Sequence, residues 1–147
     1  MAHAADNGVE IDYRVGSVEG LLDAGEKPFD VVLNLEVVEH VADPDQFLKD
    51  TAQLVKPGGL MLLATLNRTP KALALAVIGA EYVLGWLPRG THDYSKFIRP
   101  HEMEAALASG GINVARWTGV SYNPVLDRWS LSNDLAVNYM CVAVRPG

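Results

Sequence analysis

The sequence has a single cysteine, Cys141, so it cannot form a disulfide within the chain. Its first residues, MAHAADNGVE, contain no apolar run like the core of a secretory signal. These two features together predict a protein of the reducing cytoplasm. Basic residues are also scarce, because 12 Lys and Arg stand against 18 Asp and Glu, a net charge of −6. This balance argues against a protein whose main role is to bind nucleic acid.

The composition predicts one folded domain. A length of 147 residues, with 49% hydrophobic and 20% charged residues, is typical of a single globular domain, which we assign to residues 1–147. No internal repeat or low-complexity linker divides the chain.

Alternation and apolar runs predict the strands. Residues 29–35 (FDVVLNL) and 60–66 (LMLLATL) are short and almost entirely apolar, which is typical of parallel strands covered on both faces. Residues 9–15 (VEIDYRV) alternate apolar and charged side chains, which predicts a half-exposed strand. Two late segments, residues 112–122 and 135–144, flank a stretch of turn-forming residues and predict an antiparallel hairpin with a long connection.

Capping signals predict the helices. Asp43 can cap a helix over residues 44–55, with Gln46 at the capping-box position. The KPGG of residues 56–59 is expected to end this helix. Two further helices are expected over residues 70–87 and 100–109. Because a strand, a helix and a strand follow one another, the fold class is predicted to be α/β.

Charge is distributed unevenly along the chain. Residues 1–50 carry 12 acidic and three basic residues, whereas residues 68–99 carry five basic and two acidic residues. The basic surplus surrounds an apolar segment, residues 72–87, which is shorter than the roughly 20 residues that span a bilayer. Residues 67–100 are therefore interpreted as an apolar and basic insertion that faces an anionic membrane. The alternative is a helix packed on the sheet or in an oligomer interface.

Four segments carry a family resemblance. They are LEVVEHVADP (35–44), TLNR (65–68), IGAEYVLGWLPRGTHDYSKFIRP (78–100) and VNYM (137–140). They resemble the ubiquinone-biosynthesis O-methyltransferase family, within the class I S-adenosylmethionine-dependent methyltransferases. This resemblance implies a Rossmann-like sheet with a C-terminal antiparallel hairpin. Family members begin with a strand and a glycine-rich loop, yet none of the 13 glycines here forms a G-x-G pair, so the chain resembles a member without its first third.

The resemblance also implies an activity. It is O-methylation of catechol-type polyprenyl quinone precursors, with S-adenosyl-L-methionine as methyl donor and Mg²⁺ as a second cofactor. The implied partners are a lipid-tailed acceptor and an anionic membrane surface, which places a cytoplasmic protein peripherally at the inner face of the membrane. The alternative is a truncated, non-catalytic module that binds membranes or dimerises, since the uncovered edge of residues 29–35 invites pairing with another chain.

Three candidate site residues follow the first buried strand. Glu36, Glu39 and His40 lie where open α/β sheets bind their ligands, beyond the carboxyl end of a strand. Methylation of a phenol requires loss of its proton, and His40 has the intrinsic pKa of a suitable base. The resemblance implies that all three residues bind a divalent metal and that Glu39 and His40 are catalytic. Alternatively, Glu39 and His40 merely lie near the start of the next helix, where carboxylates suit the dipole.

Other candidate residues are expected to bind the cofactor or the methyl acceptor. The resemblance implies that Ser17, Val18 and Glu19 pack against the adenine of the cofactor and that Leu35 lies beside its sulfonium and sugar. Val18 and Leu35 are equally typical of core residues. Four polar residues are expected to reach the acceptor, although polar loop residues are often only solvated: Asn67, Arg68, His92 and Asp93.

Overall fold

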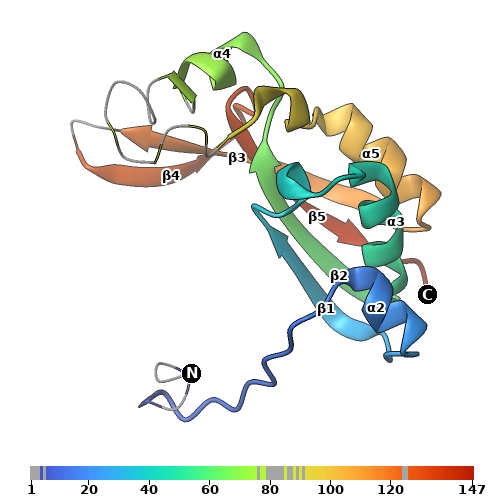
Figure 1. Ribbon diagram of the computed structural model, residues 1–147. Coiled ribbons are helices and arrows are strands. Elements are labelled where there is room, and N and C mark those ends of the chain that lie inside the picture. Colours follow the sequence, from blue (N-terminus) through green and yellow to red (C-terminus); the bar gives the residue numbers. More distant parts are fainter. Residues whose placement is uncertain are drawn as a thin grey trace.

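The computed structural model describes residues 4, 6–75, 77–78, 85, 88, 90, 92–123 and 126–147. Within them, a five-stranded sheet carries α-helices and short 3₁₀ helices (Figure 1). The strands are β1 (Phe29–Leu35), β2 (Val55–Leu66), β3 (Asn113–Asn123), β4 (Arg128–Ser132) and β5 (Asn138–Val144). The α-helices are α2 (Val18–Asp23), α3 (Pro44–Gln53), α4 (Pro70–Ala72) and α5 (Pro100–Ser109). The 3₁₀ helices are η1 (Val38–His40) and η3 (Tyr94–Lys96).

The strand order confirms the predicted α/β class. The order is β1-β2-β5-β3-β4, with β1 and β2 parallel and the other pairs antiparallel. Helix α3 connects the two parallel strands, as the sequence predicts, and β3 pairs with β5 as the predicted late strands. The long connection between those two strands contains β4, a strand that the sequence does not predict.

The start of α3 matches its predicted cap only in part. Asp43 Oδ1 accepts a hydrogen bond of 3.0 Å from the backbone N–H of Gln46, and Pro44 opens the helix. The Gln46 side chain, however, donates to Asp50 Oδ1 at 2.9 Å. The helix ends at Gln53 and β2 begins at Val55, so the prediction that residues 56–59 end the helix is wrong, since their backbone already belongs to the strand.

The cap makes a first testable contribution to stability. Asp43→Ala removes the acceptor for one orphan N–H of α3 and should lower the free energy of unfolding by about 1 kcal/mol. Urea unfolding measures this change. Asp45→Ala is the matched control, because Asp45 lies in the same first turn but does not cap the helix. Equal losses for the two variants would contradict the capping role.

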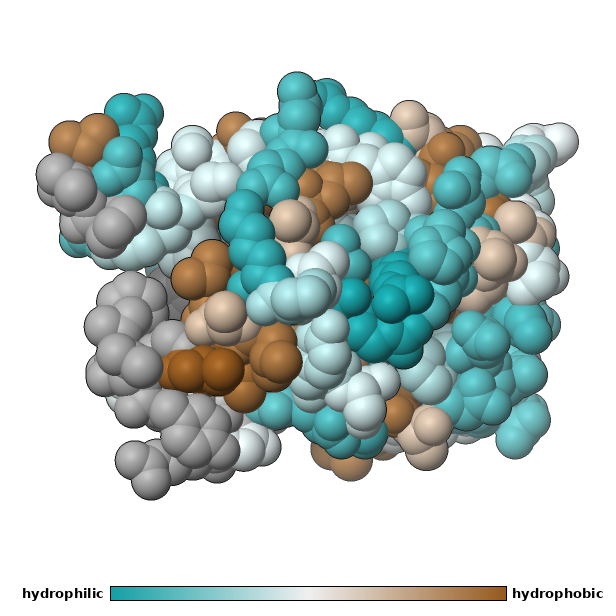
Figure 2. All heavy atoms as spheres, turned by 90° about the horizontal axis from the view of Figure 1, so that it is seen from above, coloured by the Kyte–Doolittle hydropathy of each residue, from teal (hydrophilic) through white to brown (hydrophobic). Residues whose placement is uncertain are grey.

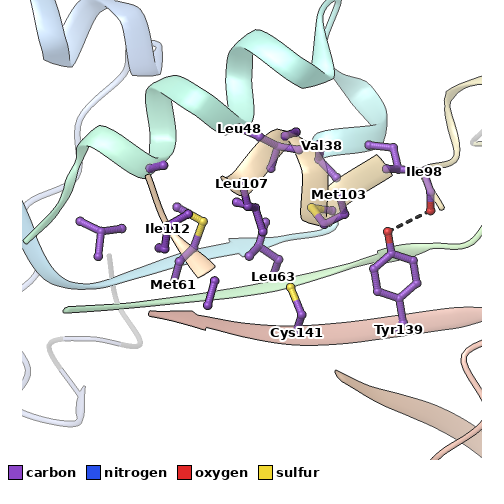
Figure 3. Close-up of a cluster of buried hydrophobic side chains, with 14 residues drawn as sticks. Val38, Leu48, Met61, Leu63, Ile98, Met103, Leu107, Ile112, Tyr139 and Cys141 are labelled. Carbon is purple, nitrogen blue, oxygen red and sulfur yellow. Dashed lines mark hydrogen bonds between the residues drawn. The ribbon is translucent and has the colours of Figure 1, made fainter. Parts of the chain in front are cut away.

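The core lies between the sheet and the pair of helices α3 and α5 (Figures 1 and 3). Met61 and Leu63 of β2 point at Leu48 of α3 and Leu107 of α5, and all four are buried. Tyr139 of β5 joins this layer and donates its hydroxyl to the backbone carbonyl of Ile98 at 2.9 Å. Cys141 lies beside it, and burial raises the pKa of its thiol to about 12, so it is a packing residue.

Two expectations about the early segments are corrected. Residues 9–15 are extended but belong to no strand, and their apolar members Val9, Ile11, Tyr13 and Val15 are exposed. An alternating pattern yields a strand only where a neighbour accepts its backbone hydrogen bonds. Strand β1, expected to be covered on both faces, exposes the alternate side chains Phe29, Val31, Leu33 and Leu35, so one of its faces is uncovered. Among the described residues β1 also ends the strand order and pairs with β2 alone, which confirms the prediction of an uncovered edge.

The predicted helix over residues 70–87 is described only at its start. Thr69 caps it by accepting from the backbone N–H of Ala72 at 3.0 Å, and residues 73–75 continue with π-helical bonding. Most of the rest of this prediction lies outside the described residues. Among the described residues, no helix is both long enough and apolar enough to cross a membrane.

Candidate functional site

The site is built at the carboxyl end of β1. Glu36 directly follows the strand, and its backbone N–H donates to the carbonyl of Ala64 in β2 at 2.9 Å. Its φ is 56°, in the left-handed region that is uncommon for a residue with a side chain. Strained backbone conformations of this kind persist only where the surrounding structure fixes them, and they are frequent at functional sites. The turn at Glu36 directs the chain into η1, which carries Glu39 and His40.

Glu39 is the most unusual residue of the site. It is only 3% exposed, and its Oε2 accepts a hydrogen bond of 2.8 Å from the hydroxyl of Thr65, which lies buried in β2. Its Oε1 is buried and has no hydrogen-bond partner among the described residues. A buried carboxylate oxygen without a partner costs free energy, so a protein keeps one where function uses it.

Two imidazoles complete the cluster. The rings of His40 and His92 lie 6.5 Å apart between centroids, and His92 meets Phe97 edge-on at 6.0 Å. Burial by the surrounding protein raises the pKa of Glu36, and the Glu39 carboxylate raises it further, whereas His92 and His40 oppose this change. The cluster of Glu36, Glu39, His40 and His92 therefore combines two carboxylates with two imidazoles at the end of one strand.

The residues expected to bind a metal do not fit that role as they stand. Across the part of the chain that the structure describes, no three His, Cys, Asp or Glu side chains are arranged to hold a metal ion. Glu36, Glu39 and His40 share one short segment, but Thr65 already occupies one oxygen of Glu39. Magnesium usually keeps several water ligands and binds through one or two carboxylates, so the number of carboxylates here does not argue against it. The missing arrangement of three ligand side chains among the described residues does.

A cleft of about 670 Å³ runs along β1, and no residue of the cluster is among those that line it. Ser17, Val18 and Glu19 line it, and Val37 and Val41, which flank η1, line it as well. Ser17 also caps α2 by accepting from the backbone N–H of Gly20 at 3.2 Å. Three of the four residues predicted to bind the cofactor therefore line this cleft, whereas Leu35 does not.

Asn34 lines the same cleft and was not predicted. It is 3% exposed, and neither its amide nitrogen nor its carbonyl oxygen has a hydrogen-bond partner among the described residues. Thr65 was likewise missed as the partner of Glu39. Both residues interrupt apolar strand sequences, FDVVLNL and LMLLATL, and a polar residue inside such a run is a signal that the sequence offers.

Of the four residues predicted to reach the methyl acceptor, one lies in the cluster and the other three form hydrogen bonds or an ion pair elsewhere in the fold. His92 belongs to the cluster. Asn67 donates to the carbonyl of Leu135 at 2.8 Å, Arg68 forms an ion pair with Glu102 of α5, and Asp93 accepts from the backbone N–H of Ser95 at the start of η3. Contact of any of these residues with an acceptor stays a prediction.

Comparison with known proteins assigns the chain to a family. The sequence profile of a family described as a methyltransferase domain matches residues 4–116, which is more than half of the chain. The chain therefore belongs to the methyltransferase domain family.

Named relatives narrow the resemblance. The chain is similar to the ubiquinone biosynthesis O-methyltransferase of Brucella anthropi, with 62% identity over 144 residues, 98% of this chain and 58% of that protein. It is similar to the protein of the same name from Parvibaculum lavamentivorans, with 62% identity over 143 residues, 97% of this chain and 56% of that protein. The resemblance expected from the four sequence segments is confirmed. The chain spans little more than half the length of these relatives.

Solved structures confirm the fold. A S-adenosylmethionine-dependent methyltransferase from Clostridium acetobutylicum matches with a TM-score of 0.65 at 10% identity, over 99% of this chain and 69% of that one. An O-methyltransferase family protein from Burkholderia thailandensis matches with a TM-score of 0.64 at 15% identity, over 99% of this chain and 39% of that one. At these identities the likeness shows the class I methyltransferase fold and nothing finer.

Proposed function

We propose that this chain is part of a S-adenosyl-L-methionine-dependent O-methyltransferase that acts on a catechol-type polyprenyl quinone precursor in ubiquinone biosynthesis. The observation that carries the proposal is the cluster of two carboxylates and two imidazoles beside a cleft lined by Ser17, Val18 and Glu19. The names of the relatives support the acceptor class. Because those relatives are named as enzymes, a non-catalytic module is not favoured.

The cluster suits proton removal from a phenolic hydroxyl. His40 is exposed and takes this proton, and the Glu36 carboxylate beside it stabilises the imidazolium that forms. The phenolate oxygen then bonds to the methyl carbon of the sulfonium as the carbon–sulfur bond breaks. The electron pair of that bond stays on sulfur, which yields S-adenosylhomocysteine. The Glu39 carboxylate, held by Thr65, is proposed to act on the same hydroxyl.

No step of this mechanism uses Mg²⁺, because the described residues do not place three ligands for it. A metal requirement stays a proposal that rests on the family resemblance. The lipid-tailed acceptor further supports peripheral association with the inner face of an anionic membrane. The basic and apolar residues 67–100 are proposed to contribute to that association.

A chimera tests the proposed activity. It joins this chain to the part of the Brucella anthropi relative that this chain does not span. We expect the chimera to transfer a methyl group from S-adenosylmethionine to a polyprenyl catechol, detected by mass spectrometry of the product. Assays with EDTA and with added Mg²⁺ decide the metal requirement. A chimera that is inert towards catechols but methylates an unrelated acceptor would remove the substrate assignment.

A further inference from the structure

Strand β4 forms one edge of the sheet, and β1 forms the opposite edge (Figure 1). It pairs with β3 along one side, and among the described residues no strand pairs with its other side. A strand at the edge of a sheet presents unpaired backbone N–H and C=O groups, which are a template for another strand. The outer side of β4 is therefore a surface that can accept a further strand.

The sequence of β4, RWSLS, has few of the features that protect a free edge. Natural edge strands are commonly blunted by lysines, prolines or bulges. This strand contains no proline and no lysine, and its pairing with β3 is continuous, without the register shift that interrupts the pairing of β3 with β5. Its one charged residue is Arg128, at the first position. The remaining four residues of this edge are uncharged.

The side chains of β4 are apolar on one face of the sheet and polar on the other. Trp129 and Leu131 share one face because side chains alternate along a strand, and they are 62% and 71% exposed. Arg128, Ser130 and Ser132 share the opposite face. Figure 2 shows apolar surface on the left of the view, the side on which the β3–β4 hairpin lies in Figure 1. The open edge therefore carries two large apolar side chains that a neighbouring strand would partly cover.

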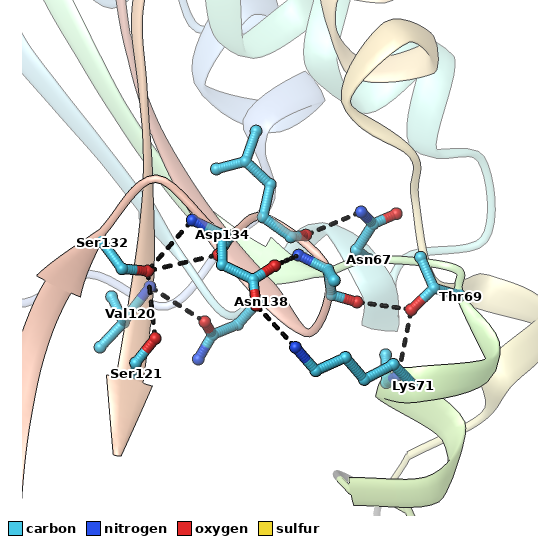
Figure 4. A network of polar contacts seen from close by, with 11 residues as sticks. Asn67, Thr69, Lys71, Val120, Ser121, Ser132, Asp134 and Asn138 are labelled. Carbon is cyan, nitrogen blue, oxygen red and sulfur yellow. Dashed lines mark hydrogen bonds and ion pairs between the residues drawn. The ribbon is translucent and has the colours of Figure 1, made fainter. Parts of the chain in front are cut away.

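Both ends of β4 are held in place within the chain. At its last residue, Ser132 Oγ accepts hydrogen bonds from the Ser121 hydroxyl at 3.1 Å and from the backbone N–H of Asp134 at 3.2 Å (Figure 4). Near its first residue, the rings of Tyr122 and Trp129 pack at 4.8 Å between centroids. Because the strand is already ordered, it loses little conformational entropy when a second strand binds.

We propose that β4 pairs with β4 of a second copy of this chain, antiparallel and about a twofold axis that passes through Ser130. In this register Ser130 lies opposite Ser130 of the second copy, and Trp129 lies opposite Leu131 of the second copy. Arg128 lies opposite Ser132 of the second copy. Each apolar residue then meets an apolar residue on the same face, and no two like charges are opposed. This self-complementary pattern favours a second copy as the partner.

Other pairings of the same edge are poorer. A twofold axis at Trp129 sets Leu131 opposite Asp127, and an axis at Leu131 sets Trp129 opposite Asn133, so an apolar side chain meets a polar one in both. Pairing of β4 with β1 of another copy joins opposite edges of the sheet, and such a head-to-tail contact continues into an open row. The axis at Ser130 gives a closed dimer, and it leaves the site at the end of β1 on the far edge of each sheet.

Disulfide trapping tests the proposed register. Directly opposed residues of antiparallel strands have Cα atoms about 4.5–5.5 Å apart, a separation that a disulfide can span. Ser130→Cys should therefore give a disulfide-linked dimer of the 147-residue chain on mild oxidation with copper phenanthroline, seen as a doubled mass in non-reducing electrophoresis. The unmodified chain is the control and should give no linked dimer, because its one cysteine, Cys141, is buried.

Two further cysteine variants decide the register. Arg128→Cys alone should not link to itself, since the two copies of this position lie four residues apart along the paired strands. An equimolar mixture of Arg128→Cys and Ser132→Cys should link, because these positions are opposed across the axis. Absence of a linked dimer for Ser130→Cys, or equal yields for Arg128→Cys alone and for the mixture, would overturn the proposal.

A third experiment measures the association without a cross-link. Sedimentation velocity follows the chain that carries Leu33→Lys, which places a charge on the β1 edge and leaves β4 unchanged, and this chain should still dimerise as its concentration rises. Adding Leu131→Lys sets a charge opposite Trp129 of the second copy and should raise the dissociation constant about tenfold or more. The matched control is Leu126→Lys, because Leu126 is similarly exposed, at 69%, but lies in the turn before β4. Equal effects of these two changes, or no dimer in the Leu33→Lys chain, would contradict pairing through β4.

Discussion

Replacing Glu39 by Gln in the chimeric enzyme is expected to lower kcat by about 100-fold or more, a typical size for losing a group that acts in the transition state. The carboxylate is buried, one of its oxygens is held by Thr65, and the other has no partner among the described residues. A glutamine keeps the shape but removes the carboxylate that is proposed to act on the reacting hydroxyl. The dissociation constant for S-adenosylhomocysteine should stay nearly unchanged, since the cleft residues Ser17, Val18 and Glu19 are untouched.

Matched variants make this prediction specific. Glu36→Gln should also lower turnover, because Glu36 is close enough to Glu39 and His40 for each to shift its pKa. Glu104→Gln is the control, since Glu104 is exposed on α5, and its turnover should equal that of the unmodified chimera. If Glu39→Gln turns over normally with and without magnesium, the assigned role of this cluster is wrong. If it loses turnover and cofactor affinity together, the loss is structural.

The sequence predicted the elements that depend on neighbouring residues, such as a helix cap, and the strands that are almost entirely apolar. Asp43 and Pro44 mark the start of α3 because a cap and a first turn need only neighbouring backbone. The runs FDVVLNL and LMLLATL become β1 and β2 because an apolar strand pairs with whichever parallel strand its connecting helix brings near. Residues 9–15 show the limit of this reasoning, since their alternating pattern is equally compatible with an extended segment that has no neighbour.

The residues of the candidate site likewise include some that the sequence predicted and some that it could not predict. Glu36, Glu39 and His40 could be predicted because the end of a buried strand is a local feature with a general meaning in α/β folds. Thr65 could not be assigned to Glu39, because their contact depends on the register between β1 and β2. His92 lies far along the chain from His40, and only the folded chain shows that their rings meet. Burial without partners, as at Asn34, is likewise visible only in three dimensions.

The 147-residue chain by itself is expected not to bind S-adenosylmethionine tightly. Its cleft is lined by Ser17, Val18, Glu19 and residues of β1, and the sequence has no G-x-G loop to bring backbone N–H groups to the cofactor. Each hydrogen bond that is not made removes on the order of 1 kcal/mol, so several together weaken binding by orders of magnitude. Calorimetry with S-adenosylhomocysteine measures the affinity, and the chimera is the positive control. Micromolar binding by the isolated chain would contradict this prediction.

The same open strand should make the isolated chain self-associate. One edge of β1 has no paired strand among the described residues, and its side chains Val31 and Leu33 are exposed. An unpaired apolar edge is a template for another strand, so light scattering should show dimers or larger species that increase with concentration. Leu33→Lys places a charge on this edge and should shift the chain towards monomer, whereas Ile11→Lys, on an exposed segment outside the sheet, should not. A clean monomer at high concentration, or equal effects of the two variants, would show that β1 is not the associating edge.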